Sequence, residues 1–180
     1  QEQINWLGNG MAAFNKYYPE IEISLCFHIP TTEMQYAVQS YGYLSESFAI
    51  GKEKPSQKGD FGEYREGTVS SMPAPNYKGR SFLNLLQESG VDTVFMGHDH
   101  RNNVSISYGG IRWTYGLKTG RYDEIYVDNL GGTLITFDDS AIDVRHVYYN
   151  EEYQAEMAAR RENGTYTQKT TWSVKSTDKH

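Results

Sequence analysis

Residues 91–100 read Val-Asp-Thr-Val-Phe-Met-Gly-His-Asp-His, and this stretch carries the strongest signals for both fold and chemistry. Its first six residues form a short, mostly apolar run that is typical of a buried β-strand, and Gly97 ends the run. Two histidines follow directly, at the carboxyl end of the predicted strand. Ligand sites on open sheets gather at the carboxyl ends of strands, so this stretch predicts a functional site there.

The histidine pattern favours a transition-metal site. On an extended segment, side chains at positions i and i+2 point the same way, so His98 and His100 could reach one metal ion or straddle two. Gly97 removes a side chain where a metal centre would approach the backbone. His28 ends a second predicted strand, residues 21–29. Imidazoles from two strand ends are therefore expected to converge on a metal.

The remaining chain predicts an α+β (α/β) fold with one mixed β-sheet and flanking helices. Residues 44–78 are rich in glycine and proline and predict a long loop, either a lid or specificity loop or an insertion without function. The other expected elements are helices over residues 3–17, 33–39 and 80–90, and hairpins over residues 104–117 and 133–149.

Length and charge limit the class of protein. A chain of 180 residues suits one compact domain. Its net charge of −6 disfavours nucleic acid as a partner, because such binding gains affinity from a basic face. No run of 18 apolar residues is present, so no membrane span is expected. The sequence starts at Gln1 without an initiator methionine, and we expect it to be a piece of a longer polypeptide.

Two motifs carry a resemblance to a known family. Cys26-Phe27-His28-Ile29-Pro30 and, about seventy residues later, residues 95–103 (FMGHDHRNN) resemble the calcineurin-like metallophosphoesterases, most of all the branch similar to purple acid phosphatases. Residues 108–120 and 130–133 are similar to that family's closing strands. The resemblance implies that residues 1–150 are the C-terminal half of a four-layer αββα metallophosphoesterase sandwich, followed by a polar C-terminal extension over residues 151–180.

The resemblance also implies a reaction. Enzymes of this family hydrolyse phosphate mono- or diesters with a metal-bound hydroxide at a dinuclear centre of Fe, Mn or Zn ions. His28 and His98 would ligate one ion and His100 the other. The family's other ligands and its general acid come from N-terminal motifs that this sequence lacks. We therefore expect the chain alone to be inactive, with partial or no occupancy by metal.

Weaker candidates surround the histidines. Arg101, Lys118 and Arg121 could contact substrate phosphate, although solvated cations are the alternative interpretation, and Tyr115 could line the site. Glu33 could orient an imidazole from behind, but a carboxylate at a helix N-terminus explains it equally well. His146 lies in the middle of a predicted strand and is expected to be structural.

The expected partners follow from these assignments. The substrate would be a small phosphate ester or a phosphoprotein. One face of a half-sandwich sheet would be open, which predicts a homodimer or association with the missing N-terminal half. Two other functions stay open: a non-catalytic interaction or structural domain with remnant histidines, and an unrelated mononuclear zinc protein.

Overall fold

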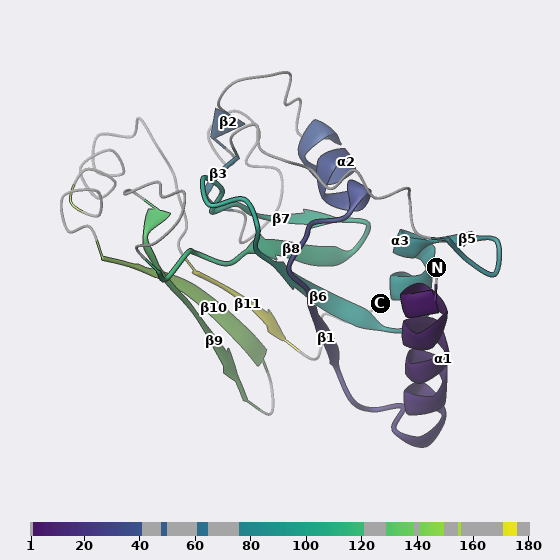
Figure 1. Ribbon diagram of the computed structural model, residues 1–180. Coiled ribbons are helices and arrows are strands. Elements are labelled where there is room, and N and C mark those ends of the chain that lie inside the picture. Colours follow the sequence, from purple (N-terminus) through teal and green to yellow (C-terminus); the bar gives the residue numbers. More distant parts are fainter. Residues whose placement is uncertain are drawn as a thin grey trace.

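The structure is a computed structural model that describes residues 2–40, 48–49, 61–64, 76–120, 129–138, 141–149, 155 and 171–175. Figure 1 shows the arrangement of its elements. The helices are α1 (Glu2–Tyr17), α2 (Thr32–Ser40) and α3 (Phe82–Glu88). The strands are β1 (Ile23–Cys26), β2 (Phe48–Ala49), β3 (Glu63–Tyr64), β4 (Asn76–Tyr77), β5 (Arg80–Ser81), β6 (Val91–Met96), β7 (Ser105–Tyr108), β8 (Ile111–Tyr115), β9 (Gly131–Phe137), β10 (Ala141–Tyr148) and β11 (Thr171–Lys175).

A four-stranded mixed sheet in the order β1-β6-β8-β7 forms the centre of the molecule. β6 pairs in parallel with both β1 and β8, while β7 and β8 form the predicted antiparallel hairpin. Gly109 and Gly110 make its turn at φ values of 61° and 78°. Both central positions of this two-residue turn require positive φ, which glycine adopts without a steric penalty.

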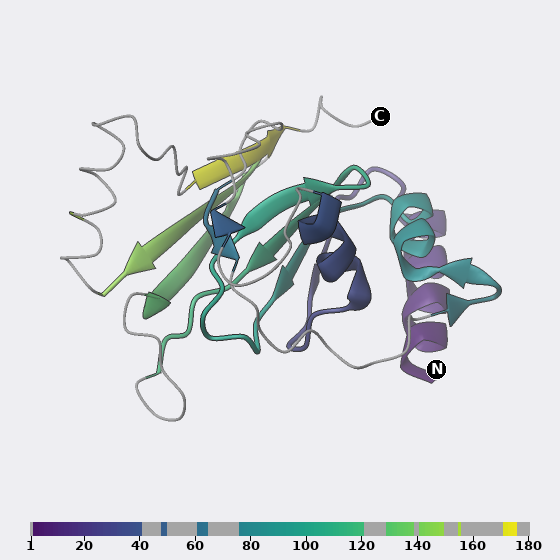
Figure 2. The same ribbon diagram turned by 90° about the horizontal axis from the view of Figure 1, so that it is seen from above.

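The main core lies between this sheet and all three helices. Alternate residues of β6, such as Val94 and Met96, face the helices, because successive side chains of a strand point to opposite faces. Met11 of α1, Met34 of α2 and Leu86 of α3 reach the same core from three directions. α1 and α3 lie side by side in both views (Figures 1 and 2), and the Asn15 amide joins them by donating to the Ser89 carbonyl oxygen at 2.8 Å.

The second predicted hairpin does not extend the central sheet. β9 and β10 pair as expected, but together with β11 they form a separate antiparallel sheet in the order β11-β10-β9. The prediction of one sheet is therefore wrong. Phe95, on the face of β6 opposite to Val94, is 7% exposed and packs in a second cluster with Phe61, Ile142 and Val144. This contact covers part of the face that we expected to be open.

The C-terminal segment also differs from its prediction. Residues 151–180 were expected to be a polar extension of the domain, yet β11 pairs with β10 along five residues, from Arg145↔Thr171 to Ala141↔Lys175. Its alternating sequence, Thr-Trp-Ser-Val-Lys, fits a strand. Most of the expected long loop over residues 44–78 lies outside the described residues. Within it, Phe61 is fully buried and pairs with Ser105 of β7.

Candidate functional site

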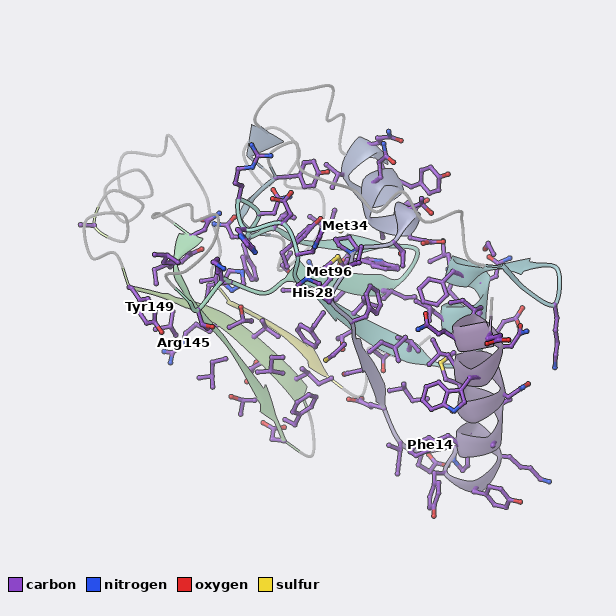
Figure 3. All side chains as sticks on the ribbon, viewed as in Figure 1. Phe14, His28, Met34, Met96, Arg145 and Tyr149 are labelled. Atoms are coloured by element: carbon purple, nitrogen blue, oxygen red, sulfur yellow. The ribbon has the colours of Figure 1, made fainter. Side chains whose placement is uncertain are left out.

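His28 and His98 meet at the carboxyl ends of two neighbouring parallel strands. The Nε2 atom of His28 lies 3.3 Å from Nδ1 of His98, and the two rings are nearly perpendicular at 83°. The backbone fixes this approach, because the Gly97 N–H donates to the His28 carbonyl oxygen at 3.0 Å. In Figure 3, His28 lies beside Met96, the last residue of β6. The predicted convergence of these two imidazoles is confirmed.

The backbone at His98 is not the extended segment that the sequence suggested. His98 has a φ of 73°, and the Asp99 N–H donates to the Gly97 carbonyl oxygen at 2.9 Å, which closes a three-residue γ-turn around it. A histidine with a positive φ of this kind costs about 1–3 kcal/mol relative to an unstrained residue. The sequence argument assumed an extended backbone at His98, and that assumption is wrong. It is the turn that directs His98 toward His28.

A buried carboxylate lies directly behind this turn. The Arg101 N–H donates to Asp99 Oδ1 at 3.2 Å, and the Asn102 amide donates to Asp99 Oδ2 at 2.6 Å. The Arg101 Nε atom lies 3.9 Å from Oδ1, so a positive charge faces the carboxylate from the solvent side. Both oxygens of this carboxylate therefore accept hydrogen bonds from within its own turn.

A second polar network joins the histidine loop to the three-stranded sheet. The His146 Nε2 atom lies 3.0 Å from the Asn103 carbonyl oxygen, and its Nδ1 atom lies 3.0 Å from Thr133 Oγ1. The Leu117 N–H donates to the same hydroxyl oxygen. The carbonyl contact requires a donor at Nε2, and a neutral ring that donates there and accepts at Nδ1 from the Thr133 hydroxyl satisfies all three groups. Burial lowers the pKa of His146 to about 4, and the bond to Asn103 opposes that shift. The prediction that His146 is structural is confirmed.

Sequence reasoning missed the asparagines that complete this framework. Asn103 is fully buried, and its amide donates to both Asn129 Oδ1 and the Tyr148 hydroxyl at 3.0 Å. The Asn129 amide in turn donates to the Arg101 carbonyl oxygen at 2.5 Å. The signal for Asn103 was the pair of amides at positions 102 and 103, one residue after the His-Asp-His motif, because polar residues so close to a buried strand need internal partners.

Tyr115 does not lie where the sequence suggested, whereas Glu33 lies in the first turn of α2, as one of its two interpretations expected. Tyr115 is 1% exposed and lies in the main core near Tyr64, so it presents no surface to a substrate. Burial and then the neighbouring Tyr64 raise its pKa well above the usual value. Glu33 is 4% exposed, and its Oε2 atom has no hydrogen-bond partner among the described residues. That oxygen therefore does not orient the His28 imidazole.

The remaining candidates are on or near the surface. The Arg101 side chain is 46% exposed beside Asp99, and Lys118 is half-buried where its segment bridges Leu130. His100 is half-buried two residues after His98. Arg121 lies outside the described residues. Within the part of the chain that the structure describes, no group of three or more His, Cys, Asp or Glu side chains is arranged to hold one metal ion.

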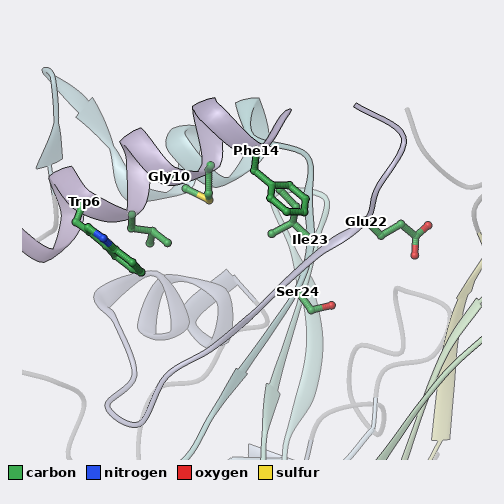
Figure 4. A pocket seen from close by; sticks show the side chains of 8 residues that line it. Trp6, Gly10, Phe14, Glu22, Ile23 and Ser24 are labelled. Atoms are coloured by element: carbon green, nitrogen blue, oxygen red, sulfur yellow. The ribbon is translucent and has the colours of Figure 1, made fainter. Parts of the chain in front are cut away.

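The molecule also has a pocket of about 440 Å³ between α1 and β1 (Figure 4). Its walls are mostly apolar, with Trp6, Met11 and Phe14 from α1, and Glu22 and Ser24 from the β1 side. All of its lining residues lie between positions 6 and 24, so the pocket is separate from the histidine pair.

Comparison with known proteins found no matching family model, no matching curated protein and no matching solved structure. Among the described helices, none combines the length and the apolar character that crossing a membrane requires.

Proposed function

We propose that this chain supplies two imidazole ligands, from His28 and His98, to the metal centre of a phosphoesterase. The 3.3 Å separation of His28 Nε2 and His98 Nδ1 is the observation that carries the proposal. The resemblance of the two histidine motifs to metallophosphoesterases supplies the reaction class, hydrolysis of phosphate esters.

The separation fits two ligands of one tetrahedral ion. Zn–N bonds of about 2.0–2.1 Å that meet at about 109° place the two nitrogen atoms about 3.3–3.4 Å apart. The pair has this spacing without rearrangement of the backbone. Binding would require both facing nitrogens to be unprotonated, which places the ring protons on Nδ1 of His28 and Nε2 of His98. The chain then contributes two neutral ligands and no charge to the site.

When bound, such an ion polarises phosphoryl oxygens and lowers the pKa of a coordinated water. The residues of this chain would hold and orient that centre. Arg101, beside the pair in sequence and exposed, could attract the anionic ester. Because two imidazoles supply half of a tetrahedral shell, the other ligands, the bridging carboxylate and the general acid would come from another segment. A partner or preceding segment is therefore part of the proposal, and the chain alone should have little turnover.

A second candidate rests on the same distance. A separation of 3.3 Å also fits an imidazole-to-imidazole hydrogen bond, in which one ring donates its N–H to the other. In that case the pair would simply join the loop after β1 to the loop after β6, and the chain would be a non-catalytic domain.

Titration with Zn²⁺ distinguishes these two functions. Affinity measured by competition with a chromophoric chelator should show one site that His28→Ala and His98→Ala each weaken at least tenfold. His180→Ala, which removes an imidazole elsewhere in the sequence, is the matched control and should leave the affinity unchanged. Equal affinities in all four proteins would reject the metal site. If the site is present, co-expression with the upstream coding segment and assays on phosphate mono- and diesters would test the reaction.

A further inference from the structure

His98 and Lys78 are the two non-glycine residues with positive φ in the described part of the chain. At Lys78 the strain lies in an exposed turn next to Gly79. At His98 it falls on the residue whose ring meets His28. Strained backbone persists only where the surroundings hold it, and it concentrates at functional positions. We therefore asked which groups hold this turn.

The turn is held on both sides. On the amino side, the Gly97 N–H donates to the His28 carbonyl oxygen, so the start of the turn is fixed to the opposite histidine. On the carboxyl side, the Asp99 carboxylate accepts from the Arg101 N–H and from the Asn102 amide. The Asp99 carbonyl oxygen also accepts from the Asn102 N–H at 3.2 Å. Three hydrogen bonds thus converge on the residue directly after His98.

The hydrogen bonds that hold the turn continue to buried residues of the protein. Asn102 is 1% exposed and hydrogen-bonds Tyr115 of β8, while the Arg101 carbonyl oxygen accepts from the buried amide of Asn129. Asn102, Tyr115 and Asn129 are all buried, so these contacts fix where Asp99 lies. A carboxylate suits this position because both of its oxygens accept hydrogen bonds, whereas an asparagine side chain offers one acceptor oxygen only.

We propose that Asp99 is a positioning residue that holds His98 in its strained turn and so keeps the His98 ring against His28. The consequence for metal affinity rests on the function proposed above, whereas the consequence for the position of the ring does not. Removal of the carboxylate releases two of the three bonds on the carboxyl side, and the turn can then relax toward negative φ. The His98 Nδ1 atom would move away from His28 Nε2, and the two-ligand spacing would be lost.

The experiment compares the wild-type chain with Asp99→Ala and with Asn15→Ala. The control loses a side chain-to-backbone hydrogen bond of 2.8 Å between α1 and the end of α3, so it reports a general loss of stability. Two quantities are measured: the nuclear Overhauser effect between the ring protons of His28 and His98, and the affinity for Zn²⁺. Asp99→Ala should abolish the ring contact and weaken Zn²⁺ binding at least tenfold, while Asn15→Ala changes neither.

Each outcome decides one of the two proposals. If Asp99→Ala is folded and keeps both the ring contact and the affinity, Asp99 has no positioning role. If the wild-type chain binds no Zn²⁺ but Asp99→Ala loses the ring contact, the metal function fails and the positioning role stands. Asp99→Asn provides the same readouts if the alanine variant does not fold, because it keeps the volume and one acceptor oxygen. In Asp99→Asn one of the two donors loses its acceptor, so the ring contact should weaken relative to the wild type and Zn²⁺ affinity should fall. A ring contact and an affinity equal to those of the wild type would overturn the positioning role.

Discussion

Replacing His146 with glutamine should remove most of the loss of stability that this protein suffers in mild acid. The folded state holds His146 neutral with a pKa of about 4, whereas a histidine in the unfolded chain titrates near its ordinary value of 6.5. Between these two values the unfolded state binds a proton that the folded state does not. Stability is therefore complete above about pH 6.5 and falls as the pH decreases toward 4.

The two pKa values set the size of the effect. At about pH 5, where most carboxylates are still ionised, His146 alone should lower the free energy of unfolding by about 2 kcal/mol relative to pH 7.5. The full shift corresponds to a limit of about 3 kcal/mol. Glutamine does not titrate, and its amide still offers an N–H donor for the Asn103 carbonyl oxygen, so the variant should retain most of the fold.

Urea unfolding followed by tryptophan fluorescence at the two pH values provides the measurement. The wild-type protein and a His180→Ala control should both lose about 2 kcal/mol more than His146→Gln between pH 7.5 and pH 5. An equal loss in all three proteins would show that His146 is not held neutral by its surroundings. The role of the His146 network would then have to be abandoned.

Three further predictions concern the backbone and the core. His98→Gly should be about 1 kcal/mol more stable than His98→Ala, although both lose the imidazole, because glycine adopts positive φ freely; equal stabilities by urea unfolding would argue against strain at this position. Gly131→Ala should unfold the protein or lower its free energy of unfolding by several kcal/mol, because the new Cβ would collide with the Val147 carbonyl oxygen. Gly10→Ala, on α1 with nothing near the new Cβ, should raise the free energy of unfolding by about 1 kcal/mol. Thermal melting distinguishes the two variants. Phe95→Ala should cost about 3–5 kcal/mol because it empties the cluster that joins the two sheets, and a loss under 1 kcal/mol would show that this contact is loose.

The regular elements were predictable where the local pattern was strong. The helix expected over residues 3–17 is α1, and the strand expected over residues 91–96 is β6, because apolar spacing determines both. Both hairpins formed as expected. The separation of β9 and β10 into their own sheet could not be predicted, since alternation along a strand does not say which sheet it joins. β11 was missed because a polar, threonine-rich segment gives a weak strand signal without its partner β10.

The two candidate ligands of the site could be predicted from the sequence, but the backbone turn and the contacts that position them could not. Strand ends with histidines indicated that His28 and His98 would meet, and they do. Positive φ at His98 gave no signal, because the residue type does not require it. Tyr115 was misplaced because its position at the end of a predicted strand does not say which way its side chain points, and the side chain lies in the main core. Contacts between distant segments decide such orientations.

The hydrogen bonds from Leu117 through Thr133 and His146 to Asn103 form a continuous series, which runs in one direction, each group donating to the next, when His146 is neutral with its proton on Nε2. His146 is buried and Thr133 is half-buried, so replacing either with a residue that cannot hydrogen-bond removes one hydrogen bond from each of its two neighbours and should cost more than one hydrogen bond. Once the series is broken, substitution of a second member should cost much less. Replacements at Thr133 and His146 that remove the hydrogen-bonding groups should therefore be non-additive, whereas His146→Gln should be milder because it keeps a donor for the Asn103 carbonyl oxygen.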